Sequence, residues 1–196
     1  MQRESIFRKF WNWLWNSNSI LSWVVSFLLA FLIVRFIFYP VIGLLLGSSI
    51  PLVVIESGSM EHFASFDKWY EAQQEDYAKI GITEEQVQKW NFRSGLNKGD
   101  IAIIKGRDFS KIKVGDVIVF RPPEQKKAII HRVVEVNAQQ GYIATKGDAN
   151  IGQLSVERKI RPEQLEGIAV LRIPFIGWIK LALVQGIQVI KQPQGI

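Results

Sequence analysis

Ser59 is the first side chain in the sequence whose surroundings suit a reactive group. It lies in the segment IESGSMEHF, residues 55–63, roughly 20 residues after a long apolar run. A serine flanked by glycine is usually part of a turn, and its hydroxyl becomes a nucleophile only when a neighbouring group accepts its proton. That group can be a histidine oriented by a carboxylate, or a lysine whose pKa is lowered by burial. A nucleophilic Ser59 therefore requires such a partner elsewhere in the chain.

His131 is the favoured partner. It lies in AIIHRVVEV, where strand alternation places Ile129, His131 and Val133 on one face. A histidine on an apolar strand face is more often a core side chain than a base, but the serine motif upstream favours the catalytic interpretation. His62 lies only three residues after Ser59 and could act as the base only if the chain turned back. Lysines on the predicted strands are a further alternative.

Asp148 is the candidate carboxylate. It follows a predicted strand in TKGDAN, residues 145–150. Gly-Asp-x-Asn commonly forms an Asx-turn, which would make its role structural. The functional alternative is that Asp148 orients the imidazole of His131. Asp100 and Asp116 occur in earlier Gly-Asp pairs before apolar segments, and we expect them to close turns.

Short β-rich segments must hold these side chains. The segment LVVIE leads into Ser59, and five more segments follow Lys98, each bounded by Gly, Pro, Asp or Asn: DIAIIKG, GDVIVFRP, AIIHRVVEV, GYIATKG and GIAVLRI. This pattern predicts a mainly β domain over residues 50–172, built as a small antiparallel barrel or coiled sheet.

Residues 61–98 interrupt the β pattern. The segment FDKWYEAQQEDYAKIGI has helical spacing, and TEEQ from Thr83 predicts a capping box before a second short helix. We interpret this as a helical insertion that acts as a lid or a partner surface. A surface excursion without a role is the alternative.

A transmembrane anchor is predicted over residues 18–40. The chain carries no charge from Phe10 to Val34, and about 20 apolar residues span a bilayer. Pro40 and Gly43 are expected to end the helix. A cleavable signal peptide is the alternative, but the run is long and no small-x-small site follows promptly.

Charge and apolar pattern predict the topology at both ends. Arg3, Arg8 and Lys9 precede the anchor against Glu4 alone, so residues 1–17 are expected in the cytoplasm and the β domain outside. The tail, residues 173–196, is apolar with polar residues on one helical face. It is predicted to be an interfacial helix, with a second short span as the alternative.

Composition narrows the function classes. The chain has 196 residues, no cysteine and two histidines, which excludes disulfides and thiolate metal sites and disfavours a histidine-rich one. Its net charge of +6 comes without a basic run interleaved with aromatic residues, so an anionic membrane surface is a better partner than nucleic acid.

The motifs in their order resemble type I signal peptidases. SGSM after an N-terminal anchor, GD before a strand, GDVIVF, IIHRVV and KGDAN carry this resemblance, which covers most of residues 18–172 outside the insertion. Bacterial members have a lysine base at the position of His131, so the histidine resembles the archaeal and endoplasmic-reticulum type. The resemblance implies Ser59 as nucleophile, His131 as general base and Asp148 as the orienting or supporting carboxylate.

The resemblance also implies the surroundings of the nucleophile. The Ser59 N–H, helped by the Ser57 hydroxyl, would form the oxyanion hole. Ile55, Met60 and Ile130 are expected to line shallow pockets for small substrate side chains, from their proximity to the motifs.

Two departures from the family pattern are visible. Many relatives have proline soon after SGSM, followed closely by GD, where this chain has Glu61, His62 and the insertion. Many also have a second aspartate after the GD-x-N loop, where this chain reads IGQLSVERKI. Glu157 could replace that aspartate.

The function expected from the resemblance is a membrane-bound serine endopeptidase without a cofactor. It would remove N-terminal signal peptides from exported preproteins after small-x-small sites, with the bilayer and the translocation machinery as further partners. One alternative is a related serine peptidase that matures pilins or other exported proteins. Another is a non-catalytic membrane module that binds partners through residues 61–98. A self-cleaving repressor-like protease is disfavoured by the anchor.

Overall fold

A computed structural model describes residues 5–123 and 125–183. The chain divides into two compact units, Met1–Leu45 and Leu46–Ile196. The first is helical and the second contains the β domain.

The N-terminal unit contains one long apolar helix after a short one. Helix α1 (Ile6–Asn16) begins at the Ser5 cap, and α2 (Ile20–Ile33) begins at the Ser19 cap. A π-helical turn, Val34–Phe38, and α3 (Tyr39–Leu46) continue α2 without a break. Within residues 20–46 the most apolar window has a mean hydropathy of 2.5, and only 6% of that window is buried. The predicted N-terminal apolar helix, a candidate membrane span by length and composition, is confirmed.

The end of this helix differs from the sequence prediction. Pro40 was expected to end it, but helical structure continues to Leu46 and the chain turns at Gly47, where φ is +61°. A proline ring in a regular α-helix clashes with the carbonyl four residues earlier. Here the turn before Pro40 is π-helical, and the Tyr39 N–H donates to the Val34 carbonyl five residues back. This wider turn relieves the clash, so the helix continues.

The β domain is a six-stranded antiparallel sheet with the order β1-β2-β6-β3-β4-β5. Its strands are β1 (Leu52–Val54), β2 (Ile101–Lys105), β3 (Val117–Phe120), β4 (Ile129–Asn137), β5 (Tyr142–Lys146) and β6 (Leu165–Ile173). All six strands lie where the sequence predicted them, and the mainly β fold class is confirmed. The order leaves β1 and β5 at the edges of the described sheet. Register shifts in three of the strand pairs increase its twist and coil it.

Both faces of the sheet are covered, because alternate residues of one strand belong to different clusters. On β3, Val117 and Val119 pack with Ile55, Met60 and the cluster around them. Their neighbours Ile118 and Phe120 pack in a second cluster, which comprises Ile112, Ile118, Phe120, Val133, Ile143, Ile160 and Ile168. This double burial explains why the strands read as continuous apolar runs instead of strict alternation.

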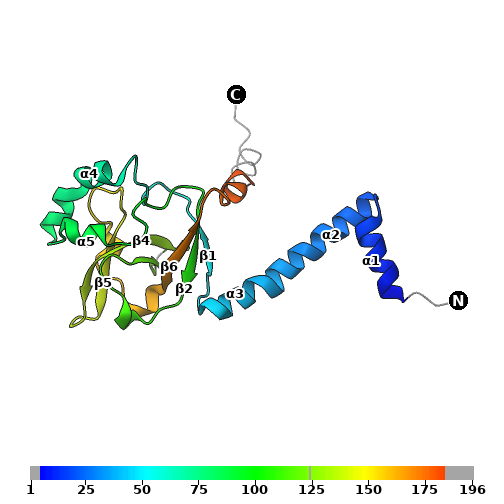
Figure 1. Ribbon diagram of the computed structural model, residues 1–196. Coiled ribbons are helices and arrows are strands. Elements are labelled where there is room, and N and C mark those ends of the chain that lie inside the picture. Colours follow the sequence, from blue (N-terminus) through cyan, green and yellow to red (C-terminus); the bar gives the residue numbers. More distant parts are fainter. Residues whose placement is uncertain (1–4, 124, 184–196) are drawn as a thin grey trace, which may run out of the picture. The chain divides into compact units, whose positions relative to one another are not determined.

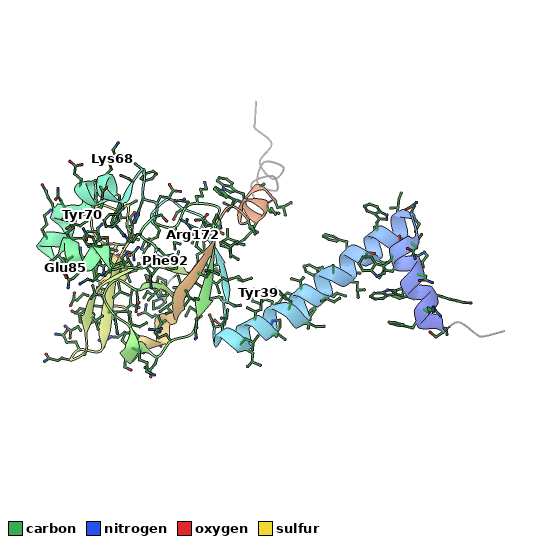
Figure 2. All side chains as sticks on the ribbon, viewed as in Figure 1. Tyr39, Lys68, Tyr70, Glu85, Phe92 and Arg172 are labelled. Atoms are coloured by element: carbon green, nitrogen blue, oxygen red, sulfur yellow. The ribbon has the colours of Figure 1, made fainter. Side chains whose placement is uncertain are left out.

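The insertion is helical, as predicted. Helix α4 (Phe66–Lys79) begins at the Ser65 cap, and α5 (Glu84–Gln88) begins with a capping box at Thr83. Figure 1 shows the two helices together beside β4 and β5. Their buried aromatic residues pack with Val134 of β4 in a third cluster, which comprises Trp69, Tyr77, Ile82, Val87 and Val134. Lys68 and Glu85 extend from the outer side of these helices (Figure 2).

The predicted tail helix is described only at its start. Residues 178–183 are helical after β6 ends at Ile173. The remainder of the tail lies outside the described residues, so its interfacial character stays a prediction.

The second cluster provides a test of the fold. Phe120→Ala removes a side chain that is 0% exposed, and we expect the free energy of unfolding to fall by about 3–5 kcal/mol through lost burial and a residual cavity. Urea unfolding of the full chain in detergent, followed by circular dichroism, measures it. Val136→Ala, at a 39% exposed position of β4, is the control and should cost about 0.5 kcal/mol or less. Equal losses in both variants would contradict this packing.

Candidate active site

Three segments far apart in the sequence bring a hydroxyl, an imidazole and a carboxylate into line. Ser59 follows β1, His131 lies on β4, and Glu157 ends the 3₁₀ turn Ser155–Glu157. The Nε2 of His131 lies 2.9 Å from the Ser59 Oγ. Its Nδ1 is hydrogen-bonded to Glu157 Oε1. The ring is therefore fixed at both nitrogens, between the nucleophile candidate and a carboxylate.

Strand register fixes the imidazole. His131 stands opposite Ile118 of β3 and is 4% exposed. It points to the face of β4 that carries Val133 and the second cluster. Sheet pairing on a central strand leaves this side chain little freedom, which is the condition for a precisely placed base.

Glu157 is held by its own set of donors. It is 0% exposed. The Thr145 hydroxyl donates to Oε1 at 3.0 Å, and the Leu154 N–H donates to Oε2 at 2.7 Å. An ionised carboxylate accepts all of these bonds together with the one from His131. With Nδ1–H donating to Glu157, the Nε2 of His131 can accept the Ser59 proton.

This arrangement has the chemical capacity of a serine hydrolase. The imidazole can take the hydroxyl proton as the oxygen attacks a carbonyl, and the carboxylate stabilises the imidazolium that forms. The Ser57 hydroxyl lies 3.1 Å from the Ser59 Oγ, where it can donate to a developing oxyanion.

Asp148 does not contact the imidazole of His131, so of its two predicted roles the orienting one is wrong and the structural one fits its contacts. Its carboxylate accepts from Arg132 Nε at 2.8 Å and Arg132 Nη2 at 2.6 Å, and it contacts His62 Nε2 at 2.8 Å. Arg132 follows His131 on the strand and so points to the opposite face. The loop after β5 places Asp148 on that face, and Glu157 takes the position beside His131. Both nitrogens of the ring of His131 are already bonded to Ser59 and Glu157.

The Asp148 carboxylate is buried but strongly stabilised as an anion. It is 0% exposed. Burial alone would raise its pKa, but the charge and hydrogen bonds of Arg132 and the hydrogen bond with His62 outweigh burial and lower the pKa of Asp148 to about 2. The Trp69 indole N–H also donates to the backbone carbonyl of Asp148 at 2.9 Å.

His62, the alternative base, is engaged elsewhere. Its Nδ1 lies 2.8 Å from the Arg93 carbonyl and its Nε2 bonds Asp148. Its ring stacks on Trp69 with centroids 3.7 Å apart. Neither nitrogen is free to accept a proton from Ser59.

The three predicted lining residues differ in exposure. Ile55 and Met60 are 2% and 0% exposed and belong to the first core cluster. They support the Ser59 segment from inside and offer no surface to a substrate. Ile130 is partly buried against the same cluster and keeps some exposed area. Of the three, Ile130 alone remains a candidate for contact with a substrate side chain.

The described residues show no cluster of side chains suited to bind a metal ion. Across 5–123 and 125–183, no group of three or more His, Asp or Glu side chains is arranged to hold a metal ion.

Comparisons with known proteins show similarity to one peptidase family. Residues 78–151 match the family model described as signal peptidase, peptidase S26. That match contains His131 and Asp148 but neither Ser59 nor Glu157.

Several curated relatives carry one name. The signal peptidase complex catalytic subunit SEC11 of Candida albicans is 24% identical over 160 residues, which cover 78% of this chain and 76% of the relative. The SEC11 protein of Lachancea thermotolerans is 26% identical over 156 residues, covering 74% and 73%. The SEC11 protein of Lodderomyces elongisporus is 30% identical over 105 residues, covering 50% and 63%.

These similarities and the fold agree. The site has the arrangement of a hydroxyl–imidazole–carboxylate hydrolase on a coiled antiparallel sheet, and the matches support a peptidase. The predicted resemblance to type I signal peptidases is confirmed by these matches.

The depressed pKa of Asp148 gives a test by pH. A lowered folded-state pKa contributes stability above the unfolded pKa of about 3.9, and this stability is lost as pH falls through about 2. Asp148→Asn should therefore be less stable than the parent at about pH 6, and the gap should shrink by about 2 kcal/mol towards pH 2. Urea unfolding across this range measures the gap, with the exposed Glu163→Gln as control. A gap independent of pH would contradict the ion pair.

Proposed function

We propose that this protein is a membrane-bound serine endopeptidase that removes N-terminal signal peptides from exported preproteins. The observation that carries the proposal is the line of hydrogen bonds from Ser59 through His131 to Glu157. The family assignment supports peptide-bond hydrolysis, and the names of the relatives are those of catalytic subunits.

The reaction follows from the positions of the side chains. The Ser59 Oγ attacks the scissile carbonyl while its proton passes to His131 Nε2, and the Ser57 hydroxyl and the Ser59 N–H stabilise the oxyanion. His131 then protonates the leaving amine. A water molecule, deprotonated by His131, hydrolyses the acyl-enzyme and regenerates Ser59. Glu157 orients the ring throughout, and Asp148 supports the site structurally through Arg132.

Specificity and membrane placement complete the proposal. The free edge at the start of β4, with Ile130, would accept the small side chains before the cut. The apolar helix of residues 20–46 would anchor the enzyme. The basic residues before it favour a cytoplasmic N-terminus, which would put the catalytic domain on the outer face. The archaeal and endoplasmic-reticulum type of mechanism, with histidine as base, is part of this proposal.

The Ser59–His131 pair can be tested directly. Purified full-length protein in liposomes should cleave a preprotein after a small-x-small site, and Ser59→Ala or His131→Ala should lower the rate at least about 1,000-fold. Gel analysis of processing with single-turnover rates measures this. The control is Ser110→Ala, which should retain the parent rate. The Ser110 hydroxyl donates to Asp108, and neither residue belongs to the site motifs.

The outcomes separate the alternatives. Cleavage that survives either substitution would remove the proposed mechanism. A well-folded parent that binds but never cleaves the preprotein would favour a non-catalytic membrane module instead.

Glu157 and Asp148 are distinguished by a second variant. Glu157→Gln keeps the shape of the side chain but cannot accept from His131, Thr145 and the Leu154 N–H together. We expect kcat to fall by up to about 10,000-fold, with a much smaller change in KM, because the ring loses its orientation. Steady-state kinetics measures the change, with Glu163→Gln as matched control. An unchanged kcat for Glu157→Gln would return the orienting role to another carboxylate.

A further inference from the structure

The two ends of the insertion are bonded to each other and to Met60 where the insertion leaves the β domain. Glu61 forms an isolated antiparallel bridge with Gly95, and the Leu96 N–H donates to the Met60 carbonyl at 2.8 Å. The Glu61 carboxylate also accepts from the Lys98 N–H at 2.9 Å. These contacts bring the two ends of the insertion together immediately after Ser59. His62 follows Glu61 and is the first buried side chain of the insertion.

His62 and Trp69 connect the insertion to the loop after β5. His62 bonds the Asp148 carboxylate and Trp69 bonds its backbone carbonyl. The rings of His62 and Trp69 are stacked within 6° of parallel. A backbone carbonyl and an ionised carboxylate both only accept, so the two contacts of His62 use both N–H groups of a protonated ring. His62 is 7% exposed, and its ring contacts the Arg93 carbonyl, the Asp148 carboxylate and the Trp69 ring.

The loop that His62 holds also holds the nucleophile. The Ala149 N–H donates to the Ser59 carbonyl at 2.8 Å. Gly147 lies so close that a side chain there would meet the Ser59 carbonyl at 2.9 Å. Asp148 lies between Gly147 and Ala149 in the sequence. Its carboxylate is bonded to Arg132, the neighbour of His131 on β4. One loop therefore contacts the backbone of the nucleophile and the strand of the base.

A second contact shows that the insertion is bound by more than apolar packing. Lys146, which is 2% exposed, donates to Gln73 Oε1 of α4 at 2.6 Å. Burial lowers the pKa of Lys146, and the negative charge of Asp148 partly offsets that effect. This contact ties α4 to the end of β5. The same ammonium also donates to the Gly147 carbonyl at 3.4 Å, so it supports the start of the loop of residues 147–150 as well.

We propose that His62 is a positioning residue for the peptidase: from the insertion, it fixes the loop of residues 147–150 and thereby the separation of Ser59 and His131. This gives the insertion a role inside the catalytic domain, beyond that of a lid or a partner surface. The inference rests on the proposed function for its kinetic part, and on the hydrogen-bond network alone for its structural part.

The test compares His62→Gln with a control that disturbs the same insertion elsewhere. His62→Gln loses the charge and the ring that stacks on Trp69. Thr83→Ala removes the cap of α5, which touches neither Asp148 nor Ser59. In His62→Gln we expect kcat to fall between about tenfold and 100-fold with KM nearly unchanged, because reacting groups are misplaced while binding surfaces remain. Thr83→Ala should keep the parent kcat.

Hydrogen–deuterium exchange separates this inference from the proposed function. His62→Gln should raise exchange at residues 147–150 and Thr83→Ala should not, whether or not the protein cleaves a signal peptide. If His62→Gln does not fold, Trp69→Phe removes the indole N–H that bonds the Asp148 carbonyl, together with part of the ring that stacks on His62, and should give the same changes with smaller amplitude. Unchanged exchange at 147–150 together with unchanged kcat in an active enzyme would overturn the positioning role.

Discussion

The buried pair of Asp148 and Arg132 is the interaction on which the rest of the β domain depends. A carboxylate that is 0% exposed is tolerable only because a guanidinium bonds it twice. Arg132 donates as well to the carbonyls of Asn91 and Gly115. One cation thus joins β4, the end of the insertion, the turn before β3 and the loop after β5. Removing either partner would leave an uncompensated charge among all four segments.

The two carboxylates of the site have different partners because they approach opposite faces of β4. Neighbouring residues on β4 point in opposite directions, so His131 and Arg132 each meet a different acid. Glu157 approaches from the side of Thr145 and contacts the imidazole. Asp148 approaches from the side of the insertion and contacts the guanidinium. Adjacent residues of β4 thereby support the reactive imidazole on one face and the buried ion pair on the other. The loop of residues 147–150 also links the two, because the Ala149 N–H donates to the Ser59 carbonyl.

The insertion between Ser59 and β2 is built into this arrangement. Its aromatic cluster packs on Val134, and its polar residues satisfy Asp148 and Lys146 at positions that no water reaches easily. Burial of polar groups is costly unless each finds a partner, so these contacts make the docking of the insertion specific as well as stable. Loss of this segment would remove His62 from Asp148 and Gln73 from Lys146.

The sequence by itself determined the positions of the strands, the apolar helix and the capped helices of the insertion. It also indicated Ser59 and His131 as a candidate nucleophile and base. These depend on local periodicity, turn residues and the order of motifs, which a chain displays without folding. Tertiary structure decided which acid meets the imidazole, that His62 supports Asp148, and that Ile55 and Met60 are core. It also carried the helix past Pro40 through a π-helical turn. Those outcomes depend on strand register and on where the 18-residue connection between β5 and β6 returns to the sheet. Neither can be predicted from the spacing of residues along the chain.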